Sequence, residues 1–382
     1  MKTVGGDFMM IEKKIVTVEN APEEYRMVVV SDIHAHKHIF NQLMHQVGLK
    51  DEDYLVILGD FIEKGPDSLE MLHKIRDLKE RKNTYVLMGN CEAAILSMLT
   101  EEQYAEGLIR YLNDTTWGSL LRDKCASLKI NYKKLPALEV QAKLKAALEK
   151  EIEILASLDT AVVFDQFVFV HAGVENRPDW ENSSLSSMLE QQFFMRNGHC
   201  IEGKYVVVGH IPVSNYSDTE INNSLLISHR ERIISIDGGV GVKDICQLNA
   251  LVIKKEDDGY LYFQHRVDDF EKCEILFKCH SKFESIVKVA WPNQEIEVLQ
   301  IGTSFSWCRK LATKELVYVK NEFIFEKDGH YFCKDDYVSS MIDVHEGDRV
   351  SLVGIYGKYA YVMKDGKVGW IKSDRIKKLI GR

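Results

Sequence analysis

The sequence predicts an α/β protein with a helical insert and an all-β tail. From about residue 26 to 255, short apolar runs rich in β-branched residues alternate with amphipathic stretches. Residues 92–160 are instead charged and helical in periodicity, and the sequence after about residue 265 is divided into short strands by Gly, Asn and Asp. Alternating strands and helices are typical of sheets covered by helices, whereas closely spaced strands favour small barrels.

Six apolar runs have the length and composition of buried strands. Residues 68–80, SLEMLHKIRDLKE, carry apolar side chains at helical spacing, so we expect helices on the outside of the sheets. The runs lie at 27–30, 54–58, 84–88, 167–170, 205–208 and 233–236.

The insert at 92–160 contains a stretch rich in strong helix formers, LEVQAKLKAALEKEIEILASL, at 138–158. This composition predicts one long helix. Two interpretations of the insert stay open, because a helical segment of this kind can cap a cleft or can form a packing subdomain.

The tail contains an internal repeat of strands. Residues 296–324 and 350–376 share the order apolar strand, Gly-containing turn, aromatic strand, charged turn and a closing polar-apolar segment. A β-rich repeat of roughly 50 residues indicates small barrels. The second copy, with EGDRVSLV followed by KDGKVGWIK, resembles the bacterial SH3-like fold.

Composition argues against several classes of partner. The net charge of −9 and the pI near 5.9 disfavour sequence-independent binding of nucleic acid or anionic lipid. No apolar run approaches the roughly 20 residues of a membrane helix, and the N-terminus lacks the pattern of a secretory signal, so we expect a cytoplasmic protein. The eight cysteines show no CxxC spacing, which favours reduced thiols over disulfides or structural zinc.

Residues that bind metal ions well follow five of the six runs, at the point where each run ends. In an open α/β sheet, ligand-binding side chains collect beyond the carboxyl ends of the strands, so these side chains are expected to line one crevice. Mixed oxygen and nitrogen ligands without thiolate favour Mn, Fe, Zn or Ni over Mg or Ca. Six ligands are few for two ions, so one carboxylate is expected to bridge, with Asp60 as the candidate. The residues are Asp32, His34, Asp60, Asn90, His171 and His210.

The motifs around these residues resemble a known family. SDIHAH, GDFIEKG, GNCEA, VHAG and VVVGHIPV are similar, in order and spacing, to the GDxHG, GDxxDRG, GNHE, HAG and GHTP motifs of calcineurin-like metallophosphoesterases. Within that family the chain resembles the branch of phosphoprotein phosphatases and diadenosine tetraphosphatases, as YLNDTTWGSLL (111–121) and FFMRNG (193–198) also indicate. The resemblance covers about residues 26–255.

This resemblance implies a four-layer α/β/β/α sandwich and two divalent transition metal ions, with Mn favoured and Fe, Zn or Ni as alternatives. It implies a hydroxide that bridges the ions and attacks phosphorus in line. The first ion would be held by Asp32, His34 and Asp60, and the second by Asp60, Asn90, His171 and His210. Asp237, in the segment IDGG, is interpreted as a turn residue rather than a ligand.

Three residues depart from the family's catalytic motifs. Cys91 and Glu63 stand where the family has the histidine and aspartate thought to protonate the leaving group, and Lys64 replaces a phosphate-clamping arginine. A neutral thiol is a poor proton donor, although Cys91 is also open to interpretation as an inert buried residue. The candidate catalytic residues are therefore Cys91, Glu63 and Asp60, and the candidate phosphate-binding residues are Lys64, Arg196 and Asn90. His36 and His199 are weaker candidates for the missing acid.

These departures predict a phosphohydrolase that is weak on phosphoserine. Diesters, phosphoanhydrides such as dinucleoside polyphosphates, and aryl phosphates are expected to react better, because their leaving groups depend less on an acid. The expected substrates are thus phosphorylated small molecules, nucleotides or phosphoproteins, and a peptide or protein partner is possible for the SH3-like repeats. The alternative is a catalytically weak regulatory or binding protein that works through its tail.

The expected domain boundaries follow from these patterns. A metallophosphoesterase catalytic domain would occupy residues 1–262, including the helical insert at 92–160. The first SH3-like repeat would occupy 263–328 and the second 329–382.

Overall fold

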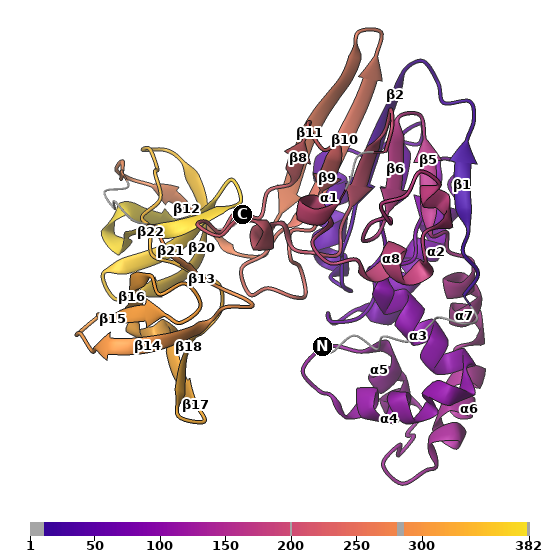
Figure 1. The fold of residues 1–382 in the computed structure, drawn as a ribbon, viewed down its shortest axis with the longest axis horizontal. Coiled ribbons are helices and arrows are strands. Elements are labelled where there is room, and N and C mark those ends of the chain that lie inside the picture. The colour runs from indigo at the N-terminus through magenta and orange to yellow at the C-terminus, as the bar shows by residue number, and fades with distance from the viewer. Residues whose placement is uncertain (1–10, 199–200, 281–285, 380–382) are drawn as a thin grey trace. The chain divides into compact units, whose positions relative to one another are not determined.

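The computed structural model describes residues 11–198, 201–280 and 286–379. The chain forms two compact units, each visible as a separate group of elements in Figure 1. The first consists of Met1–Ile211, Leu225–Val242 and Leu248–Val267, and the second of Pro212–Ser224, Lys243–Gln247 and Asp268–Arg382. The boundary expected after residue 262 does not coincide with this division, because two loops of the α/β region pack with the C-terminal strands.

The first unit contains a mixed five-stranded sheet in the order β11-β10-β2-β3-β4. Its parallel strands β2, β3 and β4 are three of the predicted apolar runs, and β10 continues the sheet antiparallel to β2. The strands are β2 (Tyr25–Val30), β3 (Tyr54–Ile57), β4 (Thr84–Val86), β10 (Leu248–Glu256) and β11 (Gly259–Val267).

A second, six-stranded sheet has the order β1-β5-β6-β7-β9-β8. Its central strands β6, β7 and β9 run parallel and are the other three predicted runs, so all six predicted strands are present. The short strands β1, β5 and β8 were not among the predicted runs, although β1 (IVTV) and β5 (AVVF) carry a similar apolar signal. The six strands are β1 (Ile15–Val18), β5 (Ala161–Phe164), β6 (Phe167–Val170), β7 (Tyr205–Val208), β8 (Leu226–Ser228) and β9 (Ile233–Ser235).

One hydrophobic cluster joins side chains of both sheets. Met27 and Val56 from the first sheet lie in the same buried cluster as Phe169 and Val207 from the second. Burying side chains of this size contributes roughly 1.5–3 kcal/mol each relative to exposure. This cluster makes the two sheets one structural body, so the loops at the strand ends are held on a common scaffold.

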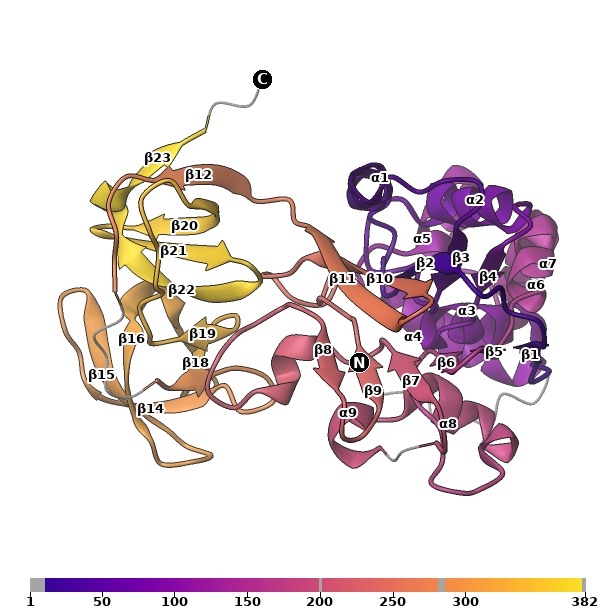
Figure 2. The same ribbon diagram turned by 90° about the horizontal axis from the view of Figure 1, so that it is seen from above.

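Helices cover the outer sides of these sheets, as Figure 2 shows for α1 and α2 on one side and α8 and α9 on the other. The outer face of the second sheet packs against α8 and α9 through Met188 and Phe194. Among the residues that the structure describes, none of the helices has the length and apolar character that crossing a bilayer requires. The four helices are α1 (Lys37–Val47), α2 (Ser68–Lys79), α8 (Leu185–Glu190) and α9 (Phe194–Asn197).

The predicted insert is helical, but the single helix predicted over 138–158 is wrong. The chain turns at the buried Leu148, where φ is −118° and ψ is 24°, and continues as a separate helix. After the turn α7 packs against α3, and α6 packs against both α3 and α4. The helices of this region are α3 (Asn90–Thr100), α4 (Ala105–Asn113), α5 (Leu120–Ser127), α6 (Ala137–Ala147) and α7 (Glu149–Ala156).

The second unit is built from two five-stranded antiparallel sheets and a short pair of strands, β13 (Lys288–Val289) and β19 (Tyr337–Val338). The first sheet, in the order β16-β15-β14-β18-β17, contains β14 (Glu295–Gln300), β15 (Phe305–Lys310), β16 (Leu316–Lys320), β17 (Ile324–Lys327) and β18 (His330–Cys333). The second sheet, in the order β22-β21-β20-β12-β23, contains β12 (Glu271–Ile275), β20 (Arg349–Tyr356), β21 (Tyr359–Lys364), β22 (Lys367–Lys372) and β23 (Ile376–Lys378).

The two repeat segments fold into the same order of elements. Each forms three antiparallel strands, a short 3-10 helix and a final strand, and the first strand of each is irregular, at Val298/Gln300 and at Leu352/Gly354. The expected boundary at 328/329 does not match the pairing, however. It separates β17 from β18, which are partners, and β12 joins the second sheet although it precedes the first repeat.

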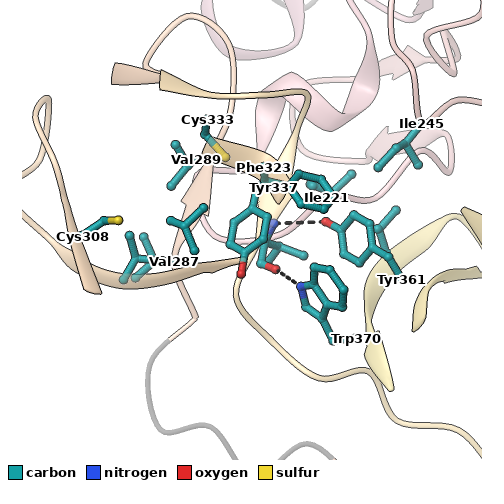
Figure 3. Close-up of a cluster of buried hydrophobic side chains, with 14 of the residues drawn as sticks. Ile221, Ile245, Val287, Val289, Cys308, Phe323, Cys333, Tyr337, Tyr361 and Trp370 are labelled. Atoms are coloured by element: carbon teal, nitrogen blue, oxygen red, sulfur yellow. Dashed lines mark hydrogen bonds between the residues drawn. The ribbon is translucent and has the colours of Figure 1, made fainter. Parts of the chain in front are cut away.

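Aromatic side chains fill the core of this unit, as Figure 3 shows. Trp370 and Tyr361 stack with ring centroids 4.4 Å apart. The Trp370 indole N–H donates to the carbonyl of Val338 at 2.9 Å, and the Val338 N–H donates to the Tyr361 hydroxyl at 3.1 Å. Ile221 and Ile245 belong to the same cluster, which explains why their loops pack with this unit.

We predict that Tyr361→Phe destabilises the second unit by about 1–3 kcal/mol, because the buried Val338 N–H loses its acceptor. Urea unfolding followed by tryptophan fluorescence measures the change. Tyr318→Phe is the matched control, since the Tyr318 side chain is 54% exposed, and it should shift the free energy of unfolding by less than about 0.5 kcal/mol. Equal shifts for both variants would contradict this prediction.

Candidate metal centre

The six predicted ligand side chains lie together in the first unit. Asp32, Asp60, His171 and His210 follow β2, β3, β6 and β7, and Asn90 is the first residue of α3 after β4. Parallel strands end at a common edge, so side chains that follow them meet there. The cluster therefore forms because the strand order β2-β3-β4 and β6-β7 brings these loops together.

Asp60 lies at the centre of the cluster. Its Oδ2 is 3.6 Å from His34 Nε2, and its Oδ1 is 3.7 Å from His171 Nε2. Asp32 Oδ1 is 3.9 Å from the same His34 nitrogen. Asp60 thus faces both halves of the cluster, as expected of a bridging carboxylate.

The amide of Asn90 joins the two remaining histidines. Its Oδ1 lies 3.1 Å from His171 Nε2 and 3.0 Å from His210 Nδ1. The backbone N–H of His210 donates to Asp32 Oδ2 at 3.0 Å. These contacts close a ring of all six predicted side chains.

The hydrogen bonds of the imidazole rings show that the cluster suits cations. His171 Nδ1 lies 2.9 Å from the carbonyl of Leu58, which can only accept, so Nδ1 carries the proton. Its Nε2 lone pair then faces the Asn90 oxygen, another acceptor. Burial lowers the pKa of His171, which favours this neutral ring. Acceptors that converge in this way fit divalent ions held by oxygen and imidazole nitrogen ligands.

The two buried carboxylates differ in their protonation. Burial and the charge of Asp60 raise the pKa of Asp32 to about 7. Burial also raises the pKa of Asp60, but His171, Lys64 and His34 outweigh it, and the net pKa lies below the ordinary value. At least one buried carboxyl group of the cluster, that of Asp60, is therefore ionised, and a divalent cation would neutralise its charge.

Lys64 reaches into the ligand cluster. Its Nζ is 3.1 Å from His34 Nε2 and 3.8 Å from Asp60 Oδ2. Burial lowers its pKa, but Cys91 and Asp60 more than compensate, so the net pKa is raised and the ammonium stays charged. The other predicted phosphate clamp, Arg196, lies on α9 with its guanidinium 5.7 Å from the centroid of the Phe193 ring.

Cys91 donates to Asp60 with both of its polar groups. The backbone N–H lies 2.9 Å from Asp60 Oδ1, and Sγ lies 3.2 Å from Asp60 Oδ2. Burial and the Asp60 charge raise the pKa of the thiol well above its usual range. Cys91, His34 and Asp60 also present ligand atoms within 4.8 Å of one another, as do Asp32, Asp60 and His171.

Glu63, the other half of the predicted acid pair, contacts the helical insert. One carboxylate oxygen accepts from the Leu120 N–H at 2.8 Å, and the other accepts from the Tyr111 hydroxyl. Burial raises the pKa of Glu63 to about 7. The Cys91 thiol is thus directed to Asp60 and the Glu63 carboxyl to Tyr111, unlike the single dyad that the family motif implies.

Sequence reasoning missed Glu92, a fully buried residue in the first turn of α3. Its carboxylate accepts four backbone N–H groups, those of Gly89 at 2.9 Å, Asp60 at 2.8 Å, Phe61 at 2.9 Å and Ile62 at 3.1 Å. Burial and the charge of Asp60 raise its pKa to about 8, while the backbone hydrogen bonds lower it. A Glu at the third helical position is a capping-box signature that could have identified it.

The loops of the site are strained. Seven of the fifteen non-glycine residues with positive φ in the described part of the chain lie here: Asp32, His34, Ala35, Asp60, Glu63, Lys64 and His210. Such backbone conformations cost free energy and cluster at functional sites. Gly89 is also constrained, since a Cβ there would lie 2.3 Å from Asp60 Oδ1.

Asp237 makes the turn contact that was predicted, but it is also fully buried beside the cluster. The Gly239 N–H donates to its Oδ1 at 2.7 Å, and burial together with the charge of Asp32 raises its pKa well above the usual range. His36 lies with Nδ1 2.7 Å from the carbonyl of His34. His199, the other alternative acid, lies outside the described residues.

The calcineurin-like phosphoesterase family matches residues 25–231, more than half of the chain. The chain belongs to this family. The predicted class of enzyme, a hydrolase of phosphoric esters or anhydrides, is thereby confirmed at the level of the family. The family uses a dinuclear site of divalent metal ions, and the cluster described above offers candidate ligands for one.

Two curated relatives match shorter segments. A Caenorhabditis elegans protein named as a serine/threonine-protein phosphatase is 33% identical over 106 residues, 26% of this chain and 29% of the relative. A symmetrical bis(5'-nucleosyl)-tetraphosphatase of Buchnera aphidicola is 34% identical over 70 residues, 18% of this chain and 25% of the relative. The matched segments span less than a third of each relative.

Two solved structures are similar to the chain. A structure described as that of a diadenosine tetraphosphatase has a TM-score of 0.41 and 19% identity, covering 68% of this chain and 100% of the other. A Saccharomyces cerevisiae serine/threonine phosphatase has a TM-score of 0.42 and 11% identity, covering 69% of this chain and 86% of the other.

We predict that Glu92→Gln weakens Mn²⁺ binding about 10- to 100-fold, because the loop that carries Asp60 loses part of its anchor. The side-chain amide would turn an N–H toward backbone donors, so the free energy of unfolding should fall by about 1–3 kcal/mol. Calorimetric Mn²⁺ titration and urea unfolding measure both effects. Glu106→Gln, an exposed change on α4, is the control, and unchanged Mn²⁺ affinity in Glu92→Gln would refute the prediction.

Proposed function

We propose that this protein is a dinuclear metal-dependent phosphohydrolase. The convergence of six acceptor-rich side chains around Asp60 carries the proposal. Asp32, His34 and Asp60 would hold one ion, and Asp60, Asn90, His171 and His210 the other. When bound, such ions supply Lewis acidity and lower the pKa of water.

The protein's own groups would orient and neutralise the substrate. The charged Lys64 ammonium near Asp60 supports a role in holding a phosphate oxygen, and Arg196 and the Asn90 amide are further candidates. Glu92 fixes the backbone around Asp60, so the ligands are preorganised before any substrate arrives. The hydrogen bond from His171 Nδ1 to the Leu58 carbonyl likewise fixes the orientation of that ring before substrate binds.

The substrates we propose have leaving groups that need little protonation. The Cys91 thiol has a raised pKa and donates to Asp60, which supports the expectation that it is a poor general acid. Phosphodiesters, dinucleoside polyphosphates and aryl phosphates are therefore favoured over phosphoserine. The names of the two relatives, a protein phosphatase and a dinucleoside tetraphosphatase, are compatible with substrates of both kinds.

Several finer expectations are part of the proposal. The cluster shared by both sheets and the helices on their outer faces support a four-layer α/β/β/α sandwich. The common element order of 296–324 and 350–376 supports two SH3-like folds, although with interleaved strands. Manganese as the physiological metal and a cytoplasmic location stay predictions from the sequence.

We predict that Asp60→Asn lowers Mn²⁺-dependent hydrolysis at least about 100-fold, because the proposed bridging charge is lost. The assay panel contains bis(p-nitrophenyl) phosphate, a dinucleoside tetraphosphate and a phosphoserine peptide. Wild-type protein should prefer the first two. Asp257→Asn, an exposed change in the turn between β10 and β11, should leave the rates unchanged. Faster turnover of the phosphopeptide, or activity that survives Asp60→Asn, would refute the proposal.

The alternative, a regulatory or binding protein, is favoured by one observation in the second unit. A pocket of about 370 Å³ is lined mainly by aromatic side chains from β15, β16, β21 and β22. Trp307 and Tyr318 lie side by side in it, with ring centroids 4.4 Å apart. Aromatic pockets of this kind suit extended peptides.

We predict that Trp307→Ala weakens any peptide bound by this pocket at least about tenfold, because one aromatic wall is removed. A synthetic peptide array probed with wild-type and variant protein measures the loss. Trp291→Ala removes another exposed tryptophan and should bind as wild type does. A wild-type protein that binds no peptide but hydrolyses the panel would exclude the alternative.

A further inference from the structure

A narrow pocket in the first unit shares a wall with the ligand cluster. It has a volume of about 30 Å³ and is lined on one side by Lys64 and Cys91. Both residues contact Asp60, through Nζ at 3.8 Å and Sγ at 3.2 Å. Tyr111, Trp117 and Arg122 of the helical region form the opposite side. A group that enters this pocket therefore lies between the cluster and the helical insert.

The other donors on the pocket wall are engaged with candidate metal ligands or with backbone carbonyls. The Cys91 thiol donates to Asp60, and the Lys64 ammonium lies 3.1 Å from His34 Nε2. The Arg122 guanidinium donates to the carbonyls of Asp114 and Trp117. Cys91 and Lys64 therefore face the candidate metal ligands, and Arg122 supports the backbone of its own loop.

Tyr111 differs because its partner is an acid that is not one of the six candidate ligands. Its hydroxyl is hydrogen-bonded to Glu63, which is only 4% exposed. The Leu120 N–H at 2.8 Å holds the other oxygen of that carboxyl group. The Ser68 hydroxyl accepts from the Glu63 N–H at 3.0 Å and fixes its backbone. The phenol and the carboxyl group thus form a rigid pair that faces the pocket.

We propose that Tyr111, backed by Glu63, is the proton donor to the leaving group of the phosphoryl-transfer reaction. This inference rests on the proposed function. It assigns the proton-donating role of the family's missing histidine to a residue of the helical insert. Tyr111 is then a catalytic residue, and Glu63 is the group that positions the phenol and returns a proton to it.

Each bond broken and each proton moved in the proposed hydrolysis has a defined donor and acceptor. Attack by water forms the new P–O bond, and its proton goes to solvent. The bond between phosphorus and the leaving oxygen breaks, and that oxygen takes the Tyr111 hydroxyl proton. Protonated Glu63 passes its own proton to the Tyr111 oxygen. The resulting Glu63 carboxylate accepts the Leu120 N–H and regains a proton from solvent.

The proton supply depends on pH in a defined direction. Burial raises the pKa of Glu63 to about 7, with Arg122 lowering it and Asp123 raising it from α5, and Tyr111 facing it from α4. Below about pH 7 the Glu63 carboxyl group is protonated and can return a proton to Tyr111. Above that pH the proton is lost, so acid assistance should decline as pH rises.

The test compares aryl phosphates whose leaving groups differ in basicity. Tyr111→Phe should slow Mn²⁺-dependent hydrolysis of phenyl phosphate about 10- to 100-fold and that of 2,4-dinitrophenyl phosphate less than about twofold. Tyr132→Phe is the control, because its hydroxyl donates to the Leu112 carbonyl at 3.0 Å in the same helical region. That variant should match wild type on both substrates.

Wild-type protein provides a second measurement that does not depend on the variant folding. Its rate should depend weakly on leaving-group basicity at pH 6 and steeply at pH 9. Equal losses of Tyr111→Phe on both substrates, or a steep wild-type dependence at pH 6, would overturn the inference while leaving the proposed function intact. A wild-type protein inactive on every phosphate would overturn both.

Discussion

The hydrogen bonds of the Glu92 carboxylate hold two parts of the candidate metal centre together. They tie the start of α3 to the loop after β3, two segments that carry Asn90 and Asp60. They add to the backbone hydrogen bonds of the same loop, such as that from the His34 N–H to the Asp60 carbonyl at 2.9 Å, and help to hold the positive φ of Asp60. The ligands on β2, β6 and β7 then meet an Asp60 side chain whose position is already set. A buried acid that is not itself a candidate ligand thus helps to fix the geometry on which the proposed chemistry depends.

Much of the α/β unit could be predicted from the sequence, because buried parallel strands leave a strong apolar signal. The six runs and the polar residues that follow them indicated both the sheets and the crevice. The family motifs then assigned Asp32 and Asp60 to one cluster, and the structure brings them together. Local signals were sufficient here, since each ligand lies within a few residues of its strand.

What could not be predicted depends on contacts between distant segments. The break at Leu148 lets both α6 and α7 pack against α3 while α6 also contacts α4, and helix propensity alone carries no sign of it. The hydrogen bond between Tyr111 and Glu63 joins the insert to the motif loop across a long separation. The inclusion of 212–224 and 243–247 in the second unit likewise depends on Ile221 and Ile245 entering its core.

The interleaved strands of the second unit affect how it is made. The strand β12 emerges from the ribosome well before β20 and β23, its two neighbours, which lie near the end of the chain. The whole sheet of β14 to β18 is synthesised in between. Assembly of this sheet must therefore wait until β20 and β23 have been synthesised, and the strand β12 stays without its sheet partners until then.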